Sequence, residues 1–453
     1  MNINPGIFKA YDVRAIYPTD LNEESTYAIV QAYVKLFKPK KVVLGKDVRE
    51  SGPSLFQSAL NAFLDAGVDV IDIGTVSTDT YYFAVGSIDC DGGITISASH
   101  NPREYNGLNF CLRGAEPVSS ENGLLEIRDL VLKDSAPIMA KKKGNVTKQN
   151  VTDEFLKRAI SFIDPSKLKP MKIVANANFG VDVLLLNRAI ELFHLPLTVF
   201  PINETPNGTF PKGPPNPLLP ENRIETLDLV KKTGSDLAVS WDADGDRCFF
   251  ADENANFIEG YFITAVIAQE LLQKYPNSKI IIDPRLTWAT TEAITKNGGT
   301  PVICKPGMTI IAAKMKQENA IFGGEMSSHF YFRDNYYRDN GIIPLLLILE
   351  ILSEKNTTLS QIANQFISKY FITGELNFET EKKDEIIEKA KEKYNDGNQT
   401  FVDGLSVEYS DFRFNLRKSN TEPLLRLNLE AMSKQRMEEK RDEIVNFIKS
   451  FGE

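Results

Sequence analysis

The sequence predicts an α/β protein built from several domains. Its 453 residues are too many for one ordinary hydrophobic core, because domains hold roughly 100 to 200 residues each, so three or four domains are expected. Patterns of strand, helix and strand recur three times along the chain. The C-terminal region instead alternates apolar and polar residues, as antiparallel strands do. We therefore expect three mixed α/β domains followed by a smaller α+β domain.

The first α/β unit is clearest in KKVVLGKDVRESGPSLFQSALNAFLDAGVDVIDIG, residues 40–74. A short apolar strand and a polar loop lead into a Ser/Gly/Pro helix start. The helix has an apolar stripe at Phe56, Leu60, Phe63 and Leu64. A second apolar strand completes a βαβ unit, which implies a mainly parallel sheet with its polar loops at one edge.

The same order recurs twice. From Met171, MKIVANA and LPLTVFP are expected strands, and VLLLNRAIELF is the helix between them. From Gly260, a long helical pattern precedes the strand SKIIIDP, another helix follows, and TPVICKPG is the next strand. Units spaced by roughly 100 residues suggest a repeated domain.

The C-terminal region differs. The lysines at 141–143 with Gly144 mark a first domain boundary, and the charged segment 381–393 leads into the last domain. From about Phe401 the stretches LSVEYSDFRFNLR and PLLRLNLEA predict strands, and residues 434–451 predict an amphipathic helix.

Composition and charge exclude several functional classes. Hydrophobic residues at 42% and charged residues at 25% are typical of a soluble globular protein, and no apolar tract approaches the roughly 18 residues of a membrane span. The start MNINPGIFKAYD lacks the features of a signal peptide, so we expect a cytoplasmic protein without a membrane partner. A net charge of −9 argues against nucleic acid. The four cysteines are far apart and form no CxxC pair, which favours reduced thiols over disulfides or zinc.

The most specific chemical signal is SWDADGDRCFFAD, residues 240–252. Asp242, Asp244 and Asp246 alternate on a loop that leaves the strand DLAVSW, and three carboxylates this close need a cation among them to stay ionised. Ligands that are all oxygen favour magnesium over zinc. An EF-hand is not indicated, because Arg247 stands where that loop needs glycine. A solvated acidic turn is the alternative.

A second loop, TISASHNPREYNGLNF, contains Ser99 beside His100. The pair allows three interpretations: a nucleophile with its base, a phosphate acceptor, or a turn. The stretch has no GxSxG elbow, and with three histidines in the chain His100 has few routes to a triad, so a hydrolase is disfavoured. The small residues around Ser99 allow close approach of a ligand.

Two further loops carry polar side chains at suggestive spacings. In GGEMSSHFYF, residues 323–332, Glu325, Ser327 and His329 alternate, so an extended segment would point all three to one side, as polyol recognition requires. A polar turn before a strand is the alternative. In RKSNTEPLLR, residues 417–426, a cation, two hydroxyls and an amide suit phosphate, with a capped turn as the alternative. Those side chains are Arg417, Ser419, Asn420 and Thr421.

These four loops, in this order, resemble the α-D-phosphohexomutase family. TISASHNP is similar to its phosphoserine loop, DADGDR to its metal loop, GEMSSH to its sugar-recognition loop and RKSNTEP to its phosphate-binding loop. The resemblance covers essentially the whole chain. It implies four domains around a central active-site cleft, the last resembling the TATA-box-binding-protein fold, over residues 1–145, 146–253, 254–370 and 371–453.

The resemblance also implies a reaction. Sugar 6-phosphates and 1-phosphates would interconvert through a hexose 1,6-bisphosphate that turns over in the cleft. GEMS followed by His329 is most similar to the phosphomannomutase/phosphoglucomutase group. The phosphoglucosamine mutases, which usually have Gln where Met326 stands, are the second candidate, and a sugar-phosphate-binding homologue with impaired catalysis is the third. We expect a monomer or a homodimer.

Residue roles follow from the same resemblance. Ser99 would be the phosphorylated serine, with one phosphate oxygen completing a Mg²⁺ site made by Asp242, Asp244 and Asp246. Magnesium and nearby cations offset charge on the transferring phosphoryl group. His100, Arg247 and Arg14 would surround that phosphoryl group, with Tyr11 close by. Glu325 and Ser327 would hold sugar hydroxyls, and the non-reacting phosphate would be bound by Arg417, Ser419, Asn420 and Thr421. Arg285 and Lys305 match positions where the family often places a basic residue near the substrate.

Four positions depart from the family pattern. Asn109 stands where a lysine is proposed to help proton transfer, and an amide cannot act as a general base. Either another group does that work, with His100 the nearest candidate by sequence, or the rate is low. Ala15 replaces a usual glycine, so a backbone with positive φ would be strained there. Met308 replaces a frequent histidine, and Ser328 replaces the glycine of GEMSGH.

Overall fold

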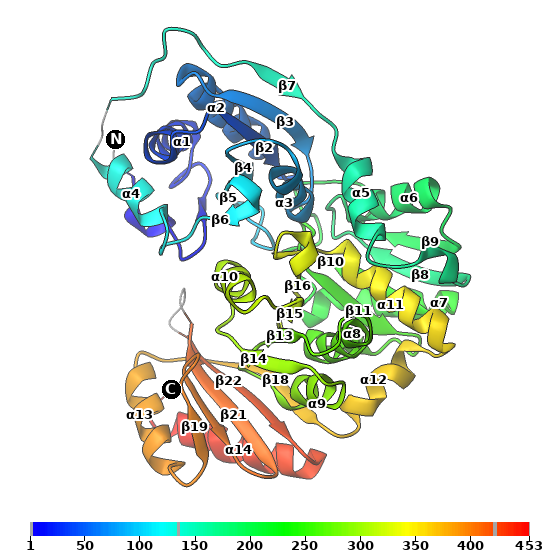
Figure 1. Cartoon of the computed structure of the whole chain (residues 1–453). Helices are drawn as coiled ribbons and strands as arrows, with labels where there is room; N and C mark the ends of the chain where they lie inside the picture. Colours follow the sequence, from blue (N-terminus) through cyan, green and yellow to red (C-terminus); the bar gives the residue numbers. More distant parts are fainter. Residues whose placement is uncertain (1–2, 134–135, 420–423, 453) are drawn as a thin grey trace. The chain divides into compact units, whose positions relative to one another are not determined.

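The computed structural model describes residues 3–133, 136–419 and 424–452. The chain divides into two compact units: Met1–Phe257 with His329–Leu359, and Ile258–Ser328 with Ser360–Glu453. Each unit contains sheets covered by helices (Figure 1). The searched part of the chain contains no helix long and apolar enough to cross a membrane.

The first unit opens with a mixed sheet in the order β1-β5-β4-β2-β3-β7, with β6 beside β5. The neighbours of β2 and the β3/β7 pair are parallel, whereas β5 runs antiparallel to its partners. The strands are β1 (Val13–Ile16), β2 (Lys41–Lys46), β3 (Asp69–Thr75), β4 (Gly92–Ile96), β5 (Tyr105–Leu112), β6 (Glu116–Pro117) and β7 (Val146–Lys148). The βαβ unit predicted over residues 40–74 is confirmed.

Four helices accompany this sheet. Helices α1, α2 and α4 share one apolar core with the strands, in which Tyr33, Phe63 and Phe110 are fully buried. Helix α3 contacts β2, β4 and β5. Helix α1 begins at a capping box, in which the Asn22 side chain accepts from the Ser25 N–H at 2.9 Å and Ser25 accepts in return. The bounds are α1 (Glu23–Phe37), α2 (Gly52–Asp65), α3 (Thr78–Ser87) and α4 (Leu124–Leu132).

A second sheet of the first unit has the order β11-β10-β8-β9, parallel except for β11. The strands and helix predicted from Met171 are confirmed as β8 (Met171–Asn176), α6 (Asp182–Phe193) and β9 (Leu197–Ile202). The other two strands of this sheet are β10 (Leu237–Trp241) and β11 (Cys248–Asp252). The first unit also contains α5 (Thr152–Ile160), α7 (Ile224–Thr233), β16 (Phe330–Phe332), β17 (Arg338–Asp339) and the apolar α11 (Ile342–Lys355). Strand β12 (Phe257–Ile258) lies where the first unit ends.

In the second unit, β13 (Lys279–Ile282) lies between β14 (Thr300–Ile303) and β15 (Phe322–Gly324), parallel to both. The third predicted α/β pattern is therefore confirmed. The helices are α8 (Gly260–Lys274), α9 (Trp288–Lys296), α10 (Met308–Glu318) and α12 (Leu359–Ile367). The first unit also contains short 3₁₀ turns, at η1 (Pro5–Ile7), η2 (Arg113–Ala115), η3 (Pro165–Lys167), η4 (Pro220–Arg223) and η5 (Arg333–Asn335).

The C-terminal sheet is antiparallel, in the order β18-β22-β21-β20-β19. One face is apolar and packs with α13 and α14, including Phe414, Leu427 and Ile444. The opposite face holds buried polar side chains at alternate positions of β21 and β22. The bounds are β18 (Phe371–Glu379), α13 (Lys383–Lys393), β19 (Asn398–Thr400), β20 (Leu405–Glu408), β21 (Phe412–Lys418), β22 (Leu424–Ala431) and α14 (Lys434–Lys449). The predicted alternation is confirmed.

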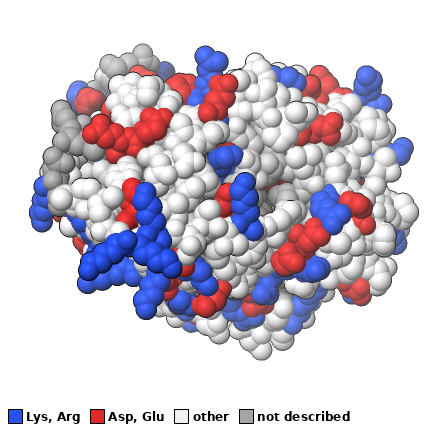
Figure 2. Space-filling model, turned by 90° about the horizontal axis from the view of Figure 1, so that it is seen from above, with Lys and Arg blue, Asp and Glu red and all other residues white. Residues whose placement is uncertain are grey.

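Two findings refine the expectations from sequence. Strand β7 pairs with β3 in the first sheet, although it begins one residue after the predicted boundary at 145. All four cysteines are free and buried. On the face in Figure 2, uncharged residues form most of the surface, acidic and basic side chains are scattered among them, and one larger group of basic side chains lies at the lower left.

Candidate active site

Ser99 lies on the loop after β4, in a backbone conformation that costs energy. Its φ is 48°, in the left-handed region that residues other than glycine seldom adopt. Two contacts hold it there: the Ser99 N–H donates to Ser97 Oγ at 3.0 Å, and its carbonyl accepts from Arg49 Nη2 at 2.6 Å. Strain of this kind persists only where the surroundings enforce it, and it is concentrated at functional sites.

Arg49 is the residue that shapes this loop, and the sequence did not assign it a role. The side chain is fully buried and pairs with Asp47 at 3.2 Å. Its guanidinium donates to four loop carbonyls, those of Ser99, Asn101, Pro102 and Tyr105, at 2.6 to 3.0 Å. The sequence offered one signal for such a role, because Arg49 lies in the polar loop GKDVRESGP between the first strand and the helix predicted over residues 40–74.

The three aspartates of the DADGDR loop lie between β10 and β11 and are buried. One oxygen from each lies within 4.8 Å of the others. Asp244 Oδ2 accepts from Thr78 Oγ1 at 2.7 Å and from Ser97 Oγ at 3.0 Å. Ser99 Oγ donates to Asp242 Oδ2 at 3.1 Å, so the two loops meet at this pair.

The electrostatics of the cluster show how unfavourable it is without a cation. Burial and the neighbouring aspartates raise the pKa of Asp242 well above its usual range, and burial with Asp246 raises the pKa of Asp244 to about 6. Burial would also raise the pKa of Asp246, but His329 and the arginines outweigh it and lower that pKa. Within the described residues, Oδ1 of Asp244 makes no hydrogen bond. Buried oxygen donors with unused lone pairs fit a hard divalent cation.

Gly245 lets the loop of the three aspartates turn, and Gly245→Ala should disrupt it. Its φ is 72°, and an added Cβ would lie 2.2 Å from Asp182 Oδ1. We expect the free energy of unfolding to fall by about 3 kcal/mol or more, with loss of metal binding. Gly234→Ala is the matched control, because its φ is 60° but no atom lies within 4 Å of the added Cβ. It should cost about 1 kcal/mol. Urea unfolding measures both variants. If Gly245→Ala and Gly234→Ala lost the same free energy of unfolding, the clash of the added Cβ with Asp182 would not be the cause.

His100 and Arg247 complete the surroundings of Ser99. His100 Nδ1 lies 3.1 Å from Ser99 Oγ and 2.8 Å from Arg247 Nη2. Removal from water and the charge of Arg247 lower the pKa of His100 well below 6.5. The imidazole is therefore neutral near pH 7.

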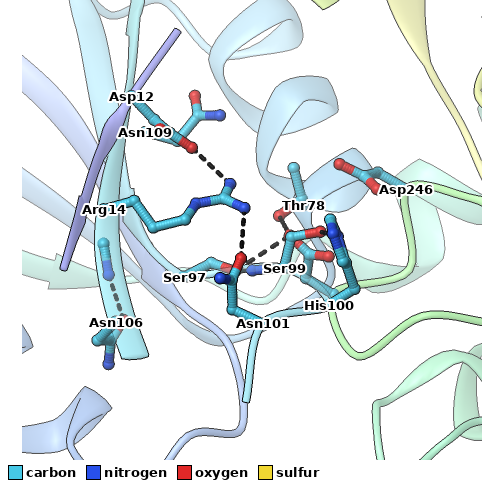
Figure 3. A network of polar contacts seen from close by, with 12 residues as sticks. Asp12, Arg14, Thr78, Ser97, Ser99, His100, Asn101, Asn106, Asn109 and Asp246 are labelled. Carbon is cyan, nitrogen blue, oxygen red and sulfur yellow. Dashed lines mark hydrogen bonds and ion pairs between the residues drawn. The ribbon is translucent and has the colours of Figure 1, made fainter. Parts of the chain in front are cut away.

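Arg14 approaches the same loop from β1. Its guanidinium donates to Asn101 Oδ1 at 2.8 Å and to Asp12, as Figure 3 shows. Tyr11 lies in the bend before this strand and is half-buried. The strain expected at Ala15 is wrong, because Ala15 pairs with Asn106 in the β1/β5 ladder and takes no positive φ. Of the four positions that depart from the family pattern, Ser328 is the one with a left-handed backbone, with a φ of 66°.

Asn109 is built into the core of the first sheet. Its amide donates to Tyr82 at 3.0 Å, and it pairs with Thr95 across the β4/β5 ladder. The Arg338 guanidinium lies 3.5 Å from the centre of the Tyr82 ring. A buried cation therefore lies next to the phenol that Asn109 contacts.

The segment from Glu325 to His329 is a turn, so the expectation of three side chains on one side of an extended strand is wrong. The Ser328 N–H donates to the Glu325 carbonyl at 3.0 Å and closes the turn. His329 then forms a β-bridge with Arg247, and its Nε2 lies 3.4 Å from Asp246 Oδ1 and 3.9 Å from Asp339 Oδ2. His329 thus lies beside the loop of the three aspartates. Asp339 is a further buried neighbour that the sequence did not indicate.

The remaining predicted side chains belong to the second unit. The buried Glu325 accepts from the Gly307 N–H at 3.0 Å. Arg285 is paired with Asp283 and lies 3.6 Å from Glu375, which Arg417 also contacts at 2.8 Å. Ser419 is buried, whereas Lys305, Ser327 and Met308, which begins α10, are half-buried. Asn420 and Thr421 lie outside the described residues.

Comparison with known proteins agrees with this architecture. The chain matches the four domains described as phosphoglucomutase/phosphomannomutase alpha/beta/alpha domains I, II and III and the C-terminal domain, over residues 5–137, 152–256, 259–370 and 375–447. These four domains, together with a serine that faces three carboxylates, define an intramolecular phosphotransferase, an enzyme of the isomerase class.

Full-length relatives narrow the class. A phosphomannomutase of Vibrio cholerae serotype O1 is 42% identical over 98% of both chains. Phosphohexose mutases of Xanthomonas campestris pv. campestris are 42% identical over 98% of this chain and 99% of theirs. The crystal structure of a phosphoglucomutase/phosphomannomutase family protein from Burkholderia thailandensis, 28% identical, superposes with a TM-score of 0.89 over 99% of this chain and 98% of that one. The chain belongs to the phosphoglucomutase/phosphomannomutase family, the α-D-phosphohexomutases.

Proposed function

We propose that the protein interconverts hexose 6-phosphates and hexose 1-phosphates, with mannose and glucose phosphates as substrates, by transferring a phosphoryl group to and from Ser99. The observation that carries this proposal is the strained Ser99, whose Oγ lies 3.1 Å from a buried carboxylate of an aspartate cluster. A hydroxyl in such a place is poorly suited to a hydrolase and well suited to carry a phosphate beside a cation.

The chemistry is two phosphoryl transfers. The bond between phosphorus and Ser99 Oγ breaks as a bond to a sugar oxygen forms, and a hexose 1,6-bisphosphate results. The bisphosphate then returns its other phosphate to Ser99. Asp242, Asp244 and Asp246 would hold Mg²⁺, which when bound offsets charge on the transferring group.

The protein's own side chains then bind, orient and move a proton. Arg14 and Arg247 donate to the transferring phosphoryl oxygens, and Tyr11 lines their side of the site. His100, neutral near pH 7, accepts the proton of the attacking sugar hydroxyl, since the amide of Asn109 cannot. Sugar and the non-reacting phosphate are recognised by Glu325, Ser327, His329, Arg285 and Lys305, and by Arg417, Ser419, Asn420 and Thr421.

Substrate profiling tests the proposal. With Mg²⁺ and added hexose 1,6-bisphosphate, we expect kcat/KM for mannose 1-phosphate and glucose 1-phosphate to exceed that for glucosamine 6-phosphate by about tenfold or more. The reverse order would favour a phosphoglucosamine mutase. Binding of the bisphosphate without turnover of any of these sugars would indicate a homologue with impaired catalysis.

Three further predictions belong to this proposal. They are domain boundaries after residues 145, 253 and 370, a monomeric or homodimeric state, and a cytoplasmic location. Intact mass of the isolated protein would reveal a phosphate on Ser99.

A further inference from the structure

Three arginines converge on the side chain of Glu375, on strand β18. Arg417 Nη2 donates to Glu375 Oε2 at 2.8 Å, and Arg285 Nη1 lies 3.6 Å from the same oxygen. Arg426 Nη1 lies 3.4 Å from Oε1. Burial opposes ionisation of Glu375, but the three guanidinium groups outweigh it and lower its pKa. One carboxylate is therefore shared by three cations.

The register of the C-terminal sheet brings two of these arginines together. Arg417 of β21 and Arg426 of β22 are direct cross-strand partners on the polar face. Like charges in this arrangement repel each other. Glu375 is opposite Asn428, two residues from Arg426 and hence on the same face, just after a bulge in β18. The anion lies where the register brings cations together.

A phosphate would use the same donors. Arg285 and Arg417 are among the side chains proposed above to bind substrate, so the inference rests on that function. Within the described part of the chain, Arg417 Nε makes no hydrogen bond, and Asp403 Oδ2 lies 3.8 Å from it. The side chains of Glu375 and Arg426 are 22% and 23% exposed, so a ligand can reach them. Carboxylate and phosphate oxygens fit the same guanidinium fork.

We propose that Glu375 is an internal competing anion, which holds Arg285, Arg417 and Arg426 together when the substrate phosphate has left and weakens the binding of that phosphate. The carboxylate does so by repelling the incoming anion and by occupying donors that the anion needs. The proposed hexose 1,6-bisphosphate must release one phosphate from these arginines and then bind to them by its other phosphate. A competing carboxylate makes this release easier. Arg426 becomes a third phosphate-binding arginine, and Glu375 is a positioning residue.

Glu375→Gln tests the proposal, because the amide keeps the shape and can still accept from Arg417 but has no charge. We expect the affinity of the full-length protein for inorganic phosphate, measured by isothermal titration calorimetry, to increase about tenfold. KM for mannose 1-phosphate should fall by a similar factor, and kcat should fall because release becomes slower. The matched control is Glu379→Gln, the same change at an exposed position of the same strand, which should alter neither quantity.

Unchanged or weaker phosphate binding in Glu375→Gln would overturn the proposal, since a carboxylate that only preorganised the arginines would give that result. Failure of the wild type to bind inorganic phosphate would overturn it as well. If the Gln variant does not fold, Glu375→Asp decides, because its charge is kept but withdrawn by one methylene. We expect phosphate to bind it about two- to threefold more tightly, and unchanged or weaker binding would overturn the proposal. Binding is measured without turnover, so loss of wild-type turnover contradicts the proposed mutase alone.

Discussion

Ser99→Ala should lower turnover of mannose 1-phosphate on the order of a thousandfold or more, because the variant lacks the hydroxyl that we propose carries the phosphate. Ser99 Oγ is the atom positioned against Asp242, and its backbone is strained so that the side chain reaches that carboxylate. Removing a nucleophile leaves only the contribution of binding and electrostatics. Any phosphate that intact mass reveals on the wild type should be absent from the variant.

Ser97→Ala is the comparison for this variant. Ser97 lies two residues away, accepts from the Ser99 N–H and donates to Asp244, so it supports the loop without carrying the phosphate. We expect a loss of roughly tenfold, with phosphate still present on the protein. A phosphorylated Ser99→Ala protein, or equal losses in the two variants, would be inconsistent with Ser99 as the acceptor.

Removing the metal should abolish turnover and expose the repulsion within the aspartate cluster. In the metal-free protein the pKa of Asp244 is raised from 3.8 to about 6 by burial and Asp246. From about pH 4 to about pH 6, the unfolded chain has released this proton while the folded chain retains it. Stability therefore falls as pH rises through this window, and the penalty is complete above it.

Asp244→Asn isolates this effect, since the amide oxygen can still accept from Thr78 and Ser97. In chelator at pH 7, we expect its free energy of unfolding to exceed that of the wild type by about 1 to 3 kcal/mol, and near pH 4 the difference should vanish. Added Mg²⁺ should stabilise the wild type at pH 7 but not the variant, whose turnover should be more than about a hundredfold lower. If Asp244→Asn were less stable than the metal-free wild type at pH 7, the charge of Asp244 would not destabilise the metal-free fold.

Much of the fold could be predicted because its information is local. Strands β8, β9, β21 and β22 follow from the period of their apolar residues, and the aspartate and serine loops follow from residue types at short spacing. The extended interpretation of the segment before His329 was wrong because alternation in three polar residues does not distinguish a strand from a turn closed by one backbone hydrogen bond.

The sequence by itself determined the family, the element order and the identity of the chemical side chains, since motifs and periodicity are properties of neighbouring residues. Only the tertiary structure decided which of these meet. It brought Thr78 to Asp244 across 166 positions, placed Arg49 under the serine loop and His329 beside Asp246, and gathered three arginines around Glu375. Strand register and buried charge pairing select such contacts, and neither leaves a periodic signal along the chain.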